Sequence, residues 1–277
     1  METASNFSEL HRLFIAKADG TGVVTETQEL NNQKFASATK IGPDLIESAF
    51  VVPAAAGAGF ALVVSDTVKN QGSGAAGAST TSFYLSTNFA LDANDVRLGS
   101  RSVPLLAANA TSAASTSLVV PAGTVTGTYY VIVQADANDE VVESNDGNNT
   151  TYGTTRVGPD LAVTGLNLPP TAGAGATISI TDTLKNAGGG TAGVTTTRFY
   201  LSANFTFDAA DVLIGSRTVP AIDPGATNTV ATSLTIPAQT AAGVYYIIAV
   251  ADADGVVTET AETNNTRANA LRITPGS

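Results

Sequence analysis

The stretch GTYYVIVQAD at residues 127–136 decides the fold class of this chain. Its aromatic and β-branched residues favour a β-strand, and it shows no helical period. It returns 116 residues later as GVYYIIAVAD at residues 243–252. The same offset holds without a gap from Pro43 onward, so that FYLS at 83–86 returns at 199–202. A repeat of this length predicts a whole domain, because solenoid units are only about 20–50 residues long.

Turn signals divide the rest of the first repeat into short apolar segments. Pro104 and Pro121 each end one segment, because proline cannot donate a hydrogen bond to a sheet. No segment has a convincing helical period. The sequence predicts an all-β chain of tandem immunoglobulin-like antiparallel β-sandwiches with about seven strands each. In addition to 127–136, strands are expected at 44–52, 59–70, 80–86, 96–103, 115–120 and 150–157.

A partial third copy precedes the two full ones. Ala18-Asp19 matches Ala135-Asp136, and residues 13–15 align with 130–132. We therefore predict three parts: the last strands of an incomplete repeat at 1–42, one sandwich at 43–157 and a second sandwich at 158–277. Short proline-containing joints at 41–44 and 157–160 predict end-to-end stacking with limited bending.

Two interpretations of residues 1–42 remain open. One is the boundary of a gene fragment, and the other is a pair of strands that adds to the sheet edge of another chain. A lone hairpin is marginally stable in water. Its apolar side chains are therefore expected to pack on the first full domain or on a neighbouring chain. These side chains are Leu13, Phe14, Ile15, Val23 and Val24.

Composition and charge exclude several classes of function. The net charge of −11 and a pI of about 4.4 oppose binding to nucleic acid or to an anionic membrane surface. The chain has no cysteine, so neither a disulfide nor a thiolate metal site can form. The sequence contains no run of 18 or more apolar residues, so it predicts no membrane-spanning segment. Residues 1–14 lack the basic start and apolar stretch of a signal peptide.

Four short motifs recur at fixed places in the repeats. Glu-x-x-acid-x-Asn-Asn begins at Glu26, Glu143 and Glu259. Pro-Asp-Leu starts each full repeat, Tyr-Leu-Ser precedes an acidic loop, and Gly-x-Tyr-Tyr precedes Ala-Asp. Together they resemble the CARDB family, the cell-adhesion-related domain found in bacteria, over nearly everything after about residue 12. The resemblance implies an immunoglobulin-like sandwich that is repeated within large prokaryotic surface or secreted proteins. It implies no defined enzymatic activity.

The chain departs from the family pattern at one place. The family often has aspartate shortly after Tyr-Leu-Ser, where this chain has Asn88 and Asn204. This difference weakens any role of the loop that depends on charge. The Asn-Asn pair of the recurring motif is expected to adopt left-handed conformations at a bulge, which asparagine tolerates well.

The residues for catalysis are scarce. His11 is the only histidine, and neither a Gly-x-Ser-x-Gly elbow nor a His-Glu-x-x-His pair is present. A carboxylate dyad of Asp92 and Asp95 is conceivable, but nothing else supports acid–base chemistry. We predict that the protein is not an enzyme.

Acidic loops make calcium the one cofactor that the sequence suggests. Calcium prefers six to eight oxygen ligands, whereas the alternative is a solvated turn in which Asp and Asn bond their own backbone. We expect the loop of the first repeat to face the final turn of the second repeat across the joint. The candidate ligands are Asn88, Asp92 and Asp95, their counterparts Asn204, Asp208 and Asp211, and Asp160, Asp252 and Asp254.

These observations predict a non-catalytic extracellular or cell-surface module that acts as a stalk or spacer in a larger surface protein. One alternative is a subunit of an extracellular filament that is joined by strand addition. Another is a carbohydrate- or protein-binding accessory module of a secreted enzyme. The expected partners are other surface proteins or neighbouring copies, with glycans as a further candidate.

Overall fold

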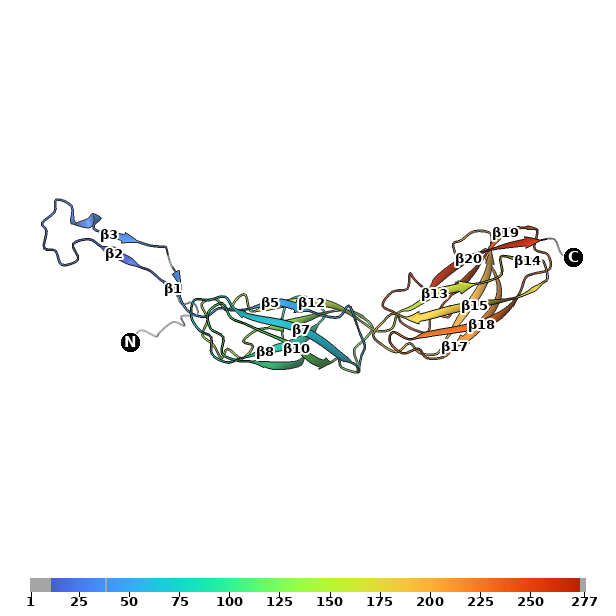
Figure 1. Cartoon of the computed structure of the whole chain (residues 1–277), viewed down its shortest axis with the longest axis horizontal. Helices are drawn as coiled ribbons and strands as arrows, with labels where there is room; N and C mark the ends of the chain where they lie inside the picture. The colour runs from blue at the N-terminus through green and yellow to red at the C-terminus, as the bar shows by residue number, and fades with distance from the viewer. Residues whose placement is uncertain (1–10, 38, 275–277) are drawn as a thin grey trace. The chain divides into compact units, whose positions relative to one another are not determined.

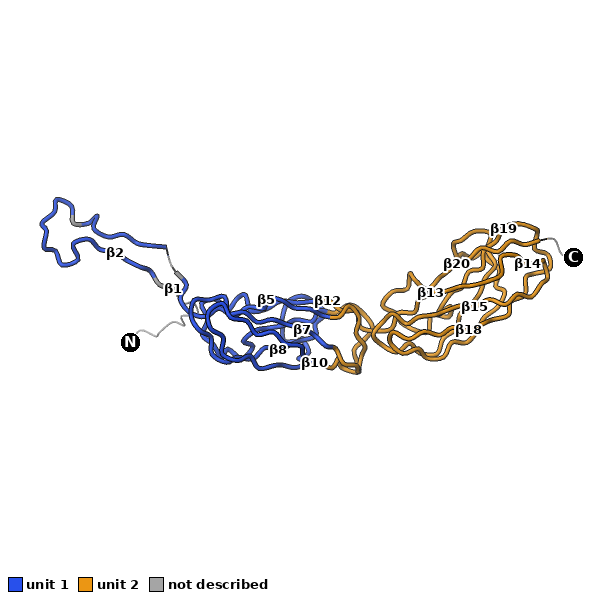
Figure 2. Tube along the Cα trace, in the orientation of Figure 1, with its two compact units in different colours: residues 1–52, 63–118, 130–153 blue, residues 53–62, 119–129, 154–277 orange. Residues whose placement is uncertain are grey.

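The structure is a computed structural model that describes residues 11–37 and 39–274. Contacts between Cα atoms divide the chain into two compact units (Figure 2). One unit consists of residues 1–52, 63–118 and 130–153, and the other of residues 53–62, 119–129 and 154–277. The domain boundaries that the repeat suggests stay a prediction.

The first full repeat forms two facing sheets (Figure 1). Three strands make one sheet in the order β10-β7-β5, and five make the other in the order β6-β12-β11-β8-β9. The strands are β5 (Leu45–Val51), β6 (Ala55–Ala56), β7 (Ala61–Asn70), β8 (Ser79–Ser86), β9 (Val96–Val103), β10 (Thr111–Val119), β11 (Gly127–Gln134) and β12 (Thr150–Val157).

The second full repeat has the same two sheets, in the orders β13-β15-β18 and β14-β20-β19-β16-β17. The predicted all-β sandwich is confirmed, with eight strands in each repeat instead of about seven. The strands are β13 (Leu161–Asn167), β14 (Thr171–Gly173), β15 (Thr177–Asn186), β16 (Thr195–Ser202), β17 (Val212–Val219), β18 (Thr227–Thr235), β19 (Gly243–Val250) and β20 (Thr266–Thr274).

Along the strands, buried and exposed side chains alternate, and the buried ones fill the space between the two sheets. In β15, every second residue from Ile178 to Asn186 is buried, and the pattern is nearly the same in β7. Phe83 and Phe199 are the largest fully buried side chains. Tyr129 is only half-buried.

The short strand β14 has a particular topological role. It runs parallel to β20, the last strand of the repeat, with Thr171 opposite Arg272 and Gly173 opposite Thr274. Strand β6 pairs with the end of β12 in the same way. At the other end of the second repeat, Thr260 N–H donates to Pro159 O at 2.9 Å, beside the turn of the final hairpin. The chain therefore begins the repeat at one end of the sandwich and leaves it at the opposite end.

Residues 11–37 and 39–40 form a hairpin that copies the last hairpin of each repeat. It consists of β1 (His11–Arg12), β2 (Ile15–Lys17), a 3₁₀ turn at Glu29–Asn31, β3 (Gln33–Phe35) and β4 (Thr39–Lys40). Strand β1 pairs with β4, and β2 pairs with β3. Ala18 N–H donates to Asn32 O at 2.8 Å, as Ala135 N–H does to Asn149 O at 2.9 Å.

The hairpin leaves its apolar side chains in solvent. Leu13, Phe14 and Ile15 are more than half exposed, and Val23 is 80% exposed. The expectation that they pack on the first full domain is therefore wrong for the described residues. Packing on a neighbouring chain stays a prediction. In the part of the chain that the structure describes, no helix has the length and apolar character needed to cross a membrane.

Candidate functional site

A buried carboxylate joins the first strand of each repeat to its last hairpin. In the first repeat, Leu45 N–H donates to Glu143 Oε2, and Asn149 Nδ2 donates to Glu143 Oε1 at 2.9 Å. In the second repeat, Leu161 and Asn265 bond Glu259 in the same way. Burial raises the pKa of both Glu143 and Glu259 to about 7, although the backbone N–H donors oppose this shift.

The neighbouring asparagine of the motif bonds a second carboxylate. Asn148 Nδ2 donates to Asp44 Oδ1 at 2.9 Å, and Asn264 Nδ2 donates to Asp160 Oδ1 at 2.7 Å. Neither asparagine has a positive φ. The prediction of left-handed conformations for the Asn-Asn pair is therefore wrong, because the pair acts through its side-chain amides. We call the four residues Asp44, Glu143, Asn148 and Asn149, with their counterparts in the second repeat, the end clamp.

Aspartate, not asparagine, has the left-handed conformation in this hairpin. Asp136 has φ +47° and Asp252 has φ +41°. The Asp136 carboxylate accepts the N–H groups of Glu140 and Val141, both at 2.9 Å. Asp19 accepts Val23 and Val24 N–H in the same way. These hydrogen bonds hold the turn and offset the cost of the left-handed conformation.

The predicted calcium ligands of the first repeat lie in the exposed loop between β8 and β9. Asn88 Oδ1 accepts Ala90 N–H at 2.7 Å, and Asp92 Oδ1 accepts Asn94 N–H at 2.7 Å. The bond from Asn94 lowers the pKa of Asp92. Asp95 Oδ2 accepts Asp92 N–H at 2.8 Å. The side chains thus bond their own backbone, as in the solvated-turn alternative, while oxygens of the kind that calcium prefers lie in one loop.

The loop of the second repeat, between β16 and β17, has the same bonds. Asn204 accepts Thr206 N–H at 2.7 Å, and Asp208 accepts Ala210 N–H at 2.7 Å. Asp211 Oδ2 accepts Asp208 N–H at 2.9 Å. The two repeats therefore hold this loop in the same conformation with the same local hydrogen bonds.

The other three predicted ligands already have partners within the second repeat. Asp160 accepts Asn264, and Asp252 accepts the N–H groups of its own turn. Asp254 Oδ1 forms an ion pair with Arg198 Nη2 at 2.5 Å. Among the described residues, no group of three or more His, Cys, Asp or Glu side chains is placed to hold a metal ion. A calcium site across the joint stays a prediction.

An ion pair between the two sheets was not anticipated from the sequence. Arg101 on β9 donates two hydrogen bonds to the fully buried side chain of Asp66 on β7 through Nε, at 3.0 and 2.8 Å, and another through Nη2. Arg217 and Asp182 repeat the arrangement in the second repeat, with 2.6 Å between Nη2 and Oδ2. The sequence did contain an indication of this ion pair. The spacing of 35 residues between Asp66 and Arg101 recurs between Asp182 and Arg217.

The first repeat adds a carboxyl group beside this ion pair. Glu47 on β5 accepts Thr81 Oγ1–H at 3.4 Å, and its Oε2 is buried without a hydrogen-bond partner among the described residues. Burial, followed by the nearby charge of Asp66, raises the pKa of Glu47 to about 8. Val163 takes this place in the second repeat. The second repeat therefore shows the same kind of ion pair without the neighbouring carboxyl group, and serves as a control for the effect of Glu47.

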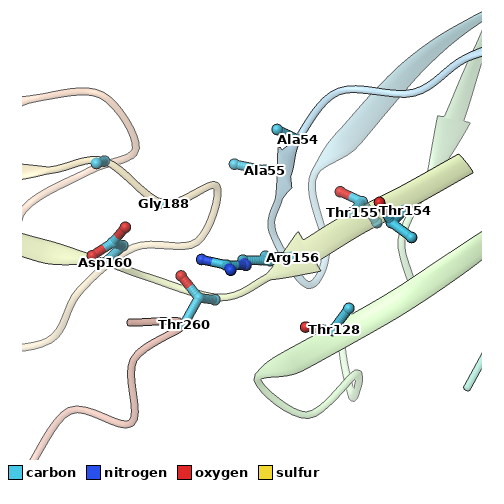
Figure 3. A pocket seen from close by; sticks show the side chains of 10 residues that line it. Ala54, Ala55, Thr128, Thr154, Thr155, Arg156, Asp160, Gly188 and Thr260 are labelled. Atoms are coloured by element: carbon cyan, nitrogen blue, oxygen red, sulfur yellow. The ribbon is translucent and has the colours of Figure 1, made fainter. Parts of the chain in front are cut away.

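A pocket of about 510 Å³ lies in the second compact unit (Figure 3). Its walls are mainly alanine and threonine, and its charged side chains are Arg156 and Asp160. Asp160 is bound by Asn264, as described above.

Three aromatic side chains gather on the first repeat at a place that the sequence did not indicate. They are Phe89 in the loop after β8, Tyr130 on β11 and Tyr152 on β12, which we call the aromatic platform. Each ring contacts the other two, with centroids 5.4 to 6.4 Å apart. The sequence did contain an indication of this site. Tyr152 corresponds to Ala268 in an otherwise closely matched repeat, so the aromatic side chain is specific to the first repeat.

The chain is similar to known proteins at the level of these repeats. The CARDB family model matches residues 42–153 and 158–269. No curated protein matches. The crystal structure of the CARDB domain of a Pyrococcus furiosus protein in complex with di-metal ions is 25% identical, covers 42% of this chain and 90% of that chain, and has a TM-score of 0.34.

Two further solved structures are more distant. A domain of a putative cell surface protein from Methanosarcina acetivorans is 19% identical, covers 42% of this chain and 92% of that chain, and has a TM-score of 0.33. Red sea bream transglutaminase is 15% identical, covers 85% of this chain and 31% of that chain, and has a TM-score of 0.39.

Proposed function

Because the chain belongs to the CARDB family, we propose that it is a non-catalytic module of the cell surface or the extracellular space. Its role in this proposal is that of a stalk or spacer that holds another part of a larger surface protein away from its attachment. A spacer must transmit tension from one end of each domain to the other without unfolding.

The parallel pairing of the second strand of each repeat with its last strand is the observation that supports this proposal. In the second repeat, Arg272 N–H donates to Pro170 O at 3.0 Å, and Ala174 N–H donates to Thr274 O at 3.4 Å. Because β14 and β20 run parallel and the chain leaves at the end of β20, tension on the two ends would slide one strand along the other. All the hydrogen bonds between β14 and β20 would then have to break together, whereas an antiparallel pair pulled from the same end could separate one bond at a time.

The end clamp supports the same role at the opposite end. Glu259 bonds Leu161 N–H at the first residue of β13, and Asp160 bonds Asn264 just before β20. Both contacts join the segment that enters the repeat to the last hairpin. Buried hydrogen bonds to charged groups are stronger than neutral ones, at about 1.5–3 kcal/mol each.

Single-molecule stretching of the full chain tests the proposal. A repeat of about 115 residues at about 3.6 Å per residue should release roughly 40 nm, less its folded length. Arg272→Pro removes one N–H between β14 and β20 and should lower the unfolding force of one repeat only. Arg156→Pro should do the same for the other repeat through the bond to Ala54 O.

A substitution in the core distinguishes an effect on the mechanical unfolding force from an effect on thermodynamic stability. Ile180→Val in β15 should lower the melting temperature by the equivalent of about 0.5–1.5 kcal/mol, with much less effect on the unfolding force. Equal unfolding forces for the proline variants and the unchanged chain would contradict the spacer role.

The exposed hairpin favours a second candidate, a subunit of an extracellular filament. Phe14, which precedes β2, Ile15 on β2 and Phe35 on β3 are each more than half exposed. A neighbouring copy could cover these side chains by adding strands to the hairpin. Light scattering should then show mass that grows with concentration, and deletion of residues 1–40 should abolish this growth. A constant monomer mass would exclude the filament.

Calcium is part of the proposal as a stiffening ligand of the acidic loops. The oxygens of Asn88, Asp92 and Asp95 have the chemistry that calcium prefers, and Asp208 and Asp211 provide the same carboxylates in the second repeat. A bound cation would reduce repulsion within a chain whose net charge is −11.

A further inference from the structure

The rings of the aromatic platform are held in a defined arrangement. The planes of Phe89 and Tyr152 differ by 37°, and their centroids are 6.1 Å apart. Tyr130 stands nearly edge-on to both, at 70° to Phe89 and 76° to Tyr152. Edge-to-face contact places the positive edge of one ring against the negative face of another. Tyr130 therefore supports two rings that remain open to solvent, with Phe89 66% and Tyr152 48% exposed.

The backbone fixes Phe89 before any ligand arrives. Ser86 Oγ accepts Asn88 N–H at 3.1 Å, and Asn88 Oδ1 accepts Ala90 N–H at 2.7 Å, so both neighbours of Phe89 are hydrogen-bonded. Tyr130 and Tyr152 project from strands of one sheet. A surface that is ordered in advance loses little conformational entropy on binding.

A cavity of about 520 Å³ adjoins the exposed rings. This volume is within the range of about 300–1,000 Å³ that is usual for small-molecule sites. Aromatic and aliphatic walls and two threonines surround it, so that it offers both apolar surface and hydroxyl groups. Its lining residues are Phe89, Ala90, Leu91, Ile132, Thr150, Thr151 and Tyr152.

The chemistry of this surface selects among ligand classes. The net charge of −11, with Asp92 directly after Leu91, disfavours an anion. A trialkylammonium group needs rings that surround it, but these three rings already contact one another. A sugar ring has a C–H face that suits the negative face of an aromatic ring, and hydroxyls at its rim that can bond threonine.

We propose that the aromatic platform and the adjoining cavity bind a neutral hexopyranose oligosaccharide. One sugar ring lies on Phe89 and Tyr152, and its hydroxyls reach the threonines at the start of β12. This activity goes beyond spacing and does not depend on it, since the site is complete within the first repeat.

The second repeat lacks a complete platform. Phe205 and Tyr246 keep the edge-on arrangement at 6.5 Å and 70°, but Ala268 takes the place of Tyr152. Phe207, the counterpart of Leu91, packs on Tyr200 at 4.7 Å instead. The second repeat is therefore a matched control in the same molecule.

The test is titration of the full chain with neutral tetrasaccharides of glucose, mannose and N-acetylglucosamine. Isothermal titration calorimetry and saturation-transfer NMR should detect one site with a dissociation constant in the millimolar range or tighter. Tyr152→Ala should weaken binding at least tenfold, and Phe89→Ala should do the same. Thermal unfolding of each variant serves as the control for folding, since Phe89 is 66% and Tyr152 48% exposed.

Three results would each overturn the proposal. One is the absence of binding to all three tetrasaccharides at tens of millimolar. Another is binding that Tyr152→Ala and Phe89→Ala leave unchanged, which would place the sugar elsewhere. The last is a preference for choline or for polygalacturonate fragments over the neutral sugars, which would show that charge governs recognition.

Discussion

Replacing Glu47 by valine should make the first repeat more stable at alkaline pH. Glu47 lies near the ion pair of Asp66 and Arg101 and, among the described residues, accepts a hydrogen bond from Thr81. Burial, followed by the charge of Asp66, raises its pKa from the ordinary 4.5 to about 8. The substitution copies the second repeat, where Val163 lies beside the same kind of ion pair.

The sign and size of the effect follow from the pKa of Glu47. Because its pKa is higher in the folded state, folding is favoured below about pH 4.5, and this contribution is lost as the pH rises through about 8. The gap between 4.5 and about 8, at about 1.36 kcal/mol per pH unit, sets a ceiling of about 5 kcal/mol. Residual contact with water reduces this value, and we expect about 2–3 kcal/mol.

Urea denaturation followed by tyrosine fluorescence measures this difference, because the chain has no tryptophan. The stability difference between Glu47→Val and the unchanged chain should grow by about 2–3 kcal/mol between pH 4.5 and pH 9. Glu143 and Glu259 also titrate in this range, with pKa values of about 7, but they are common to both proteins and cancel. Val163→Glu should introduce the same alkaline loss into the second repeat. Parallel pH profiles for Glu47→Val and the unchanged chain would refute the reasoning.

Three further predictions concern the end clamp, the hairpin and calcium. Glu143→Ala leaves Leu45 N–H buried and unpaired, and should cost about 1–3 kcal/mol in thermal unfolding; a loss below about 0.5 kcal/mol would contradict the clamp. Deleting residues 1–40 should leave two repeats that unfold with little loss of cooperativity, whereas unfolding of the first repeat would show that the hairpin is integral to it. Millimolar calcium should raise the melting temperature over a chelator, by the equivalent of about 2.7 kcal/mol at 100 times the dissociation constant. Asp92→Ala with Asp208→Ala should remove this rise, and equal melting curves with and without calcium would leave the loops as solvated turns.

The strand positions were predictable because they depend on local pattern. Alternating burial in β7 and β15 follows the alternation of apolar residues, and GTYYVIVQAD forms β11 as expected. Because the two repeats align without a gap, each strand was predicted from two copies of the sequence. The short strands β6 and β14 were missed, because alanine and glycine have little preference for strands. They exist only through parallel pairing with β12 and β20.

The roles of the polar motifs were less predictable than their positions. The Asn-Asn pair was singled out because its motif recurs three times in the chain. The left-handed backbone conformation that was predicted for it is wrong. Asn148 bonds Asp44, which is 104 residues earlier in the chain. No local pattern can indicate a partner at that separation. The acidic loops are the opposite case, because their hydrogen bonds span two or three residues, as in the solvated turn that is the alternative to a calcium site.

The sequence by itself determined the family, the strands, the repeat and the local turns, because each depends on residues close together in the chain or on comparison of one copy with the other. Only the tertiary structure decided which distant side chains meet. The aromatic platform joins a loop to two strands of one sheet, and Glu47 meets Asp66 and Arg101 from three different strands. Packing of the sheets creates these contacts, and their chemistry depends on burial and on distances between atoms that are far apart in the chain.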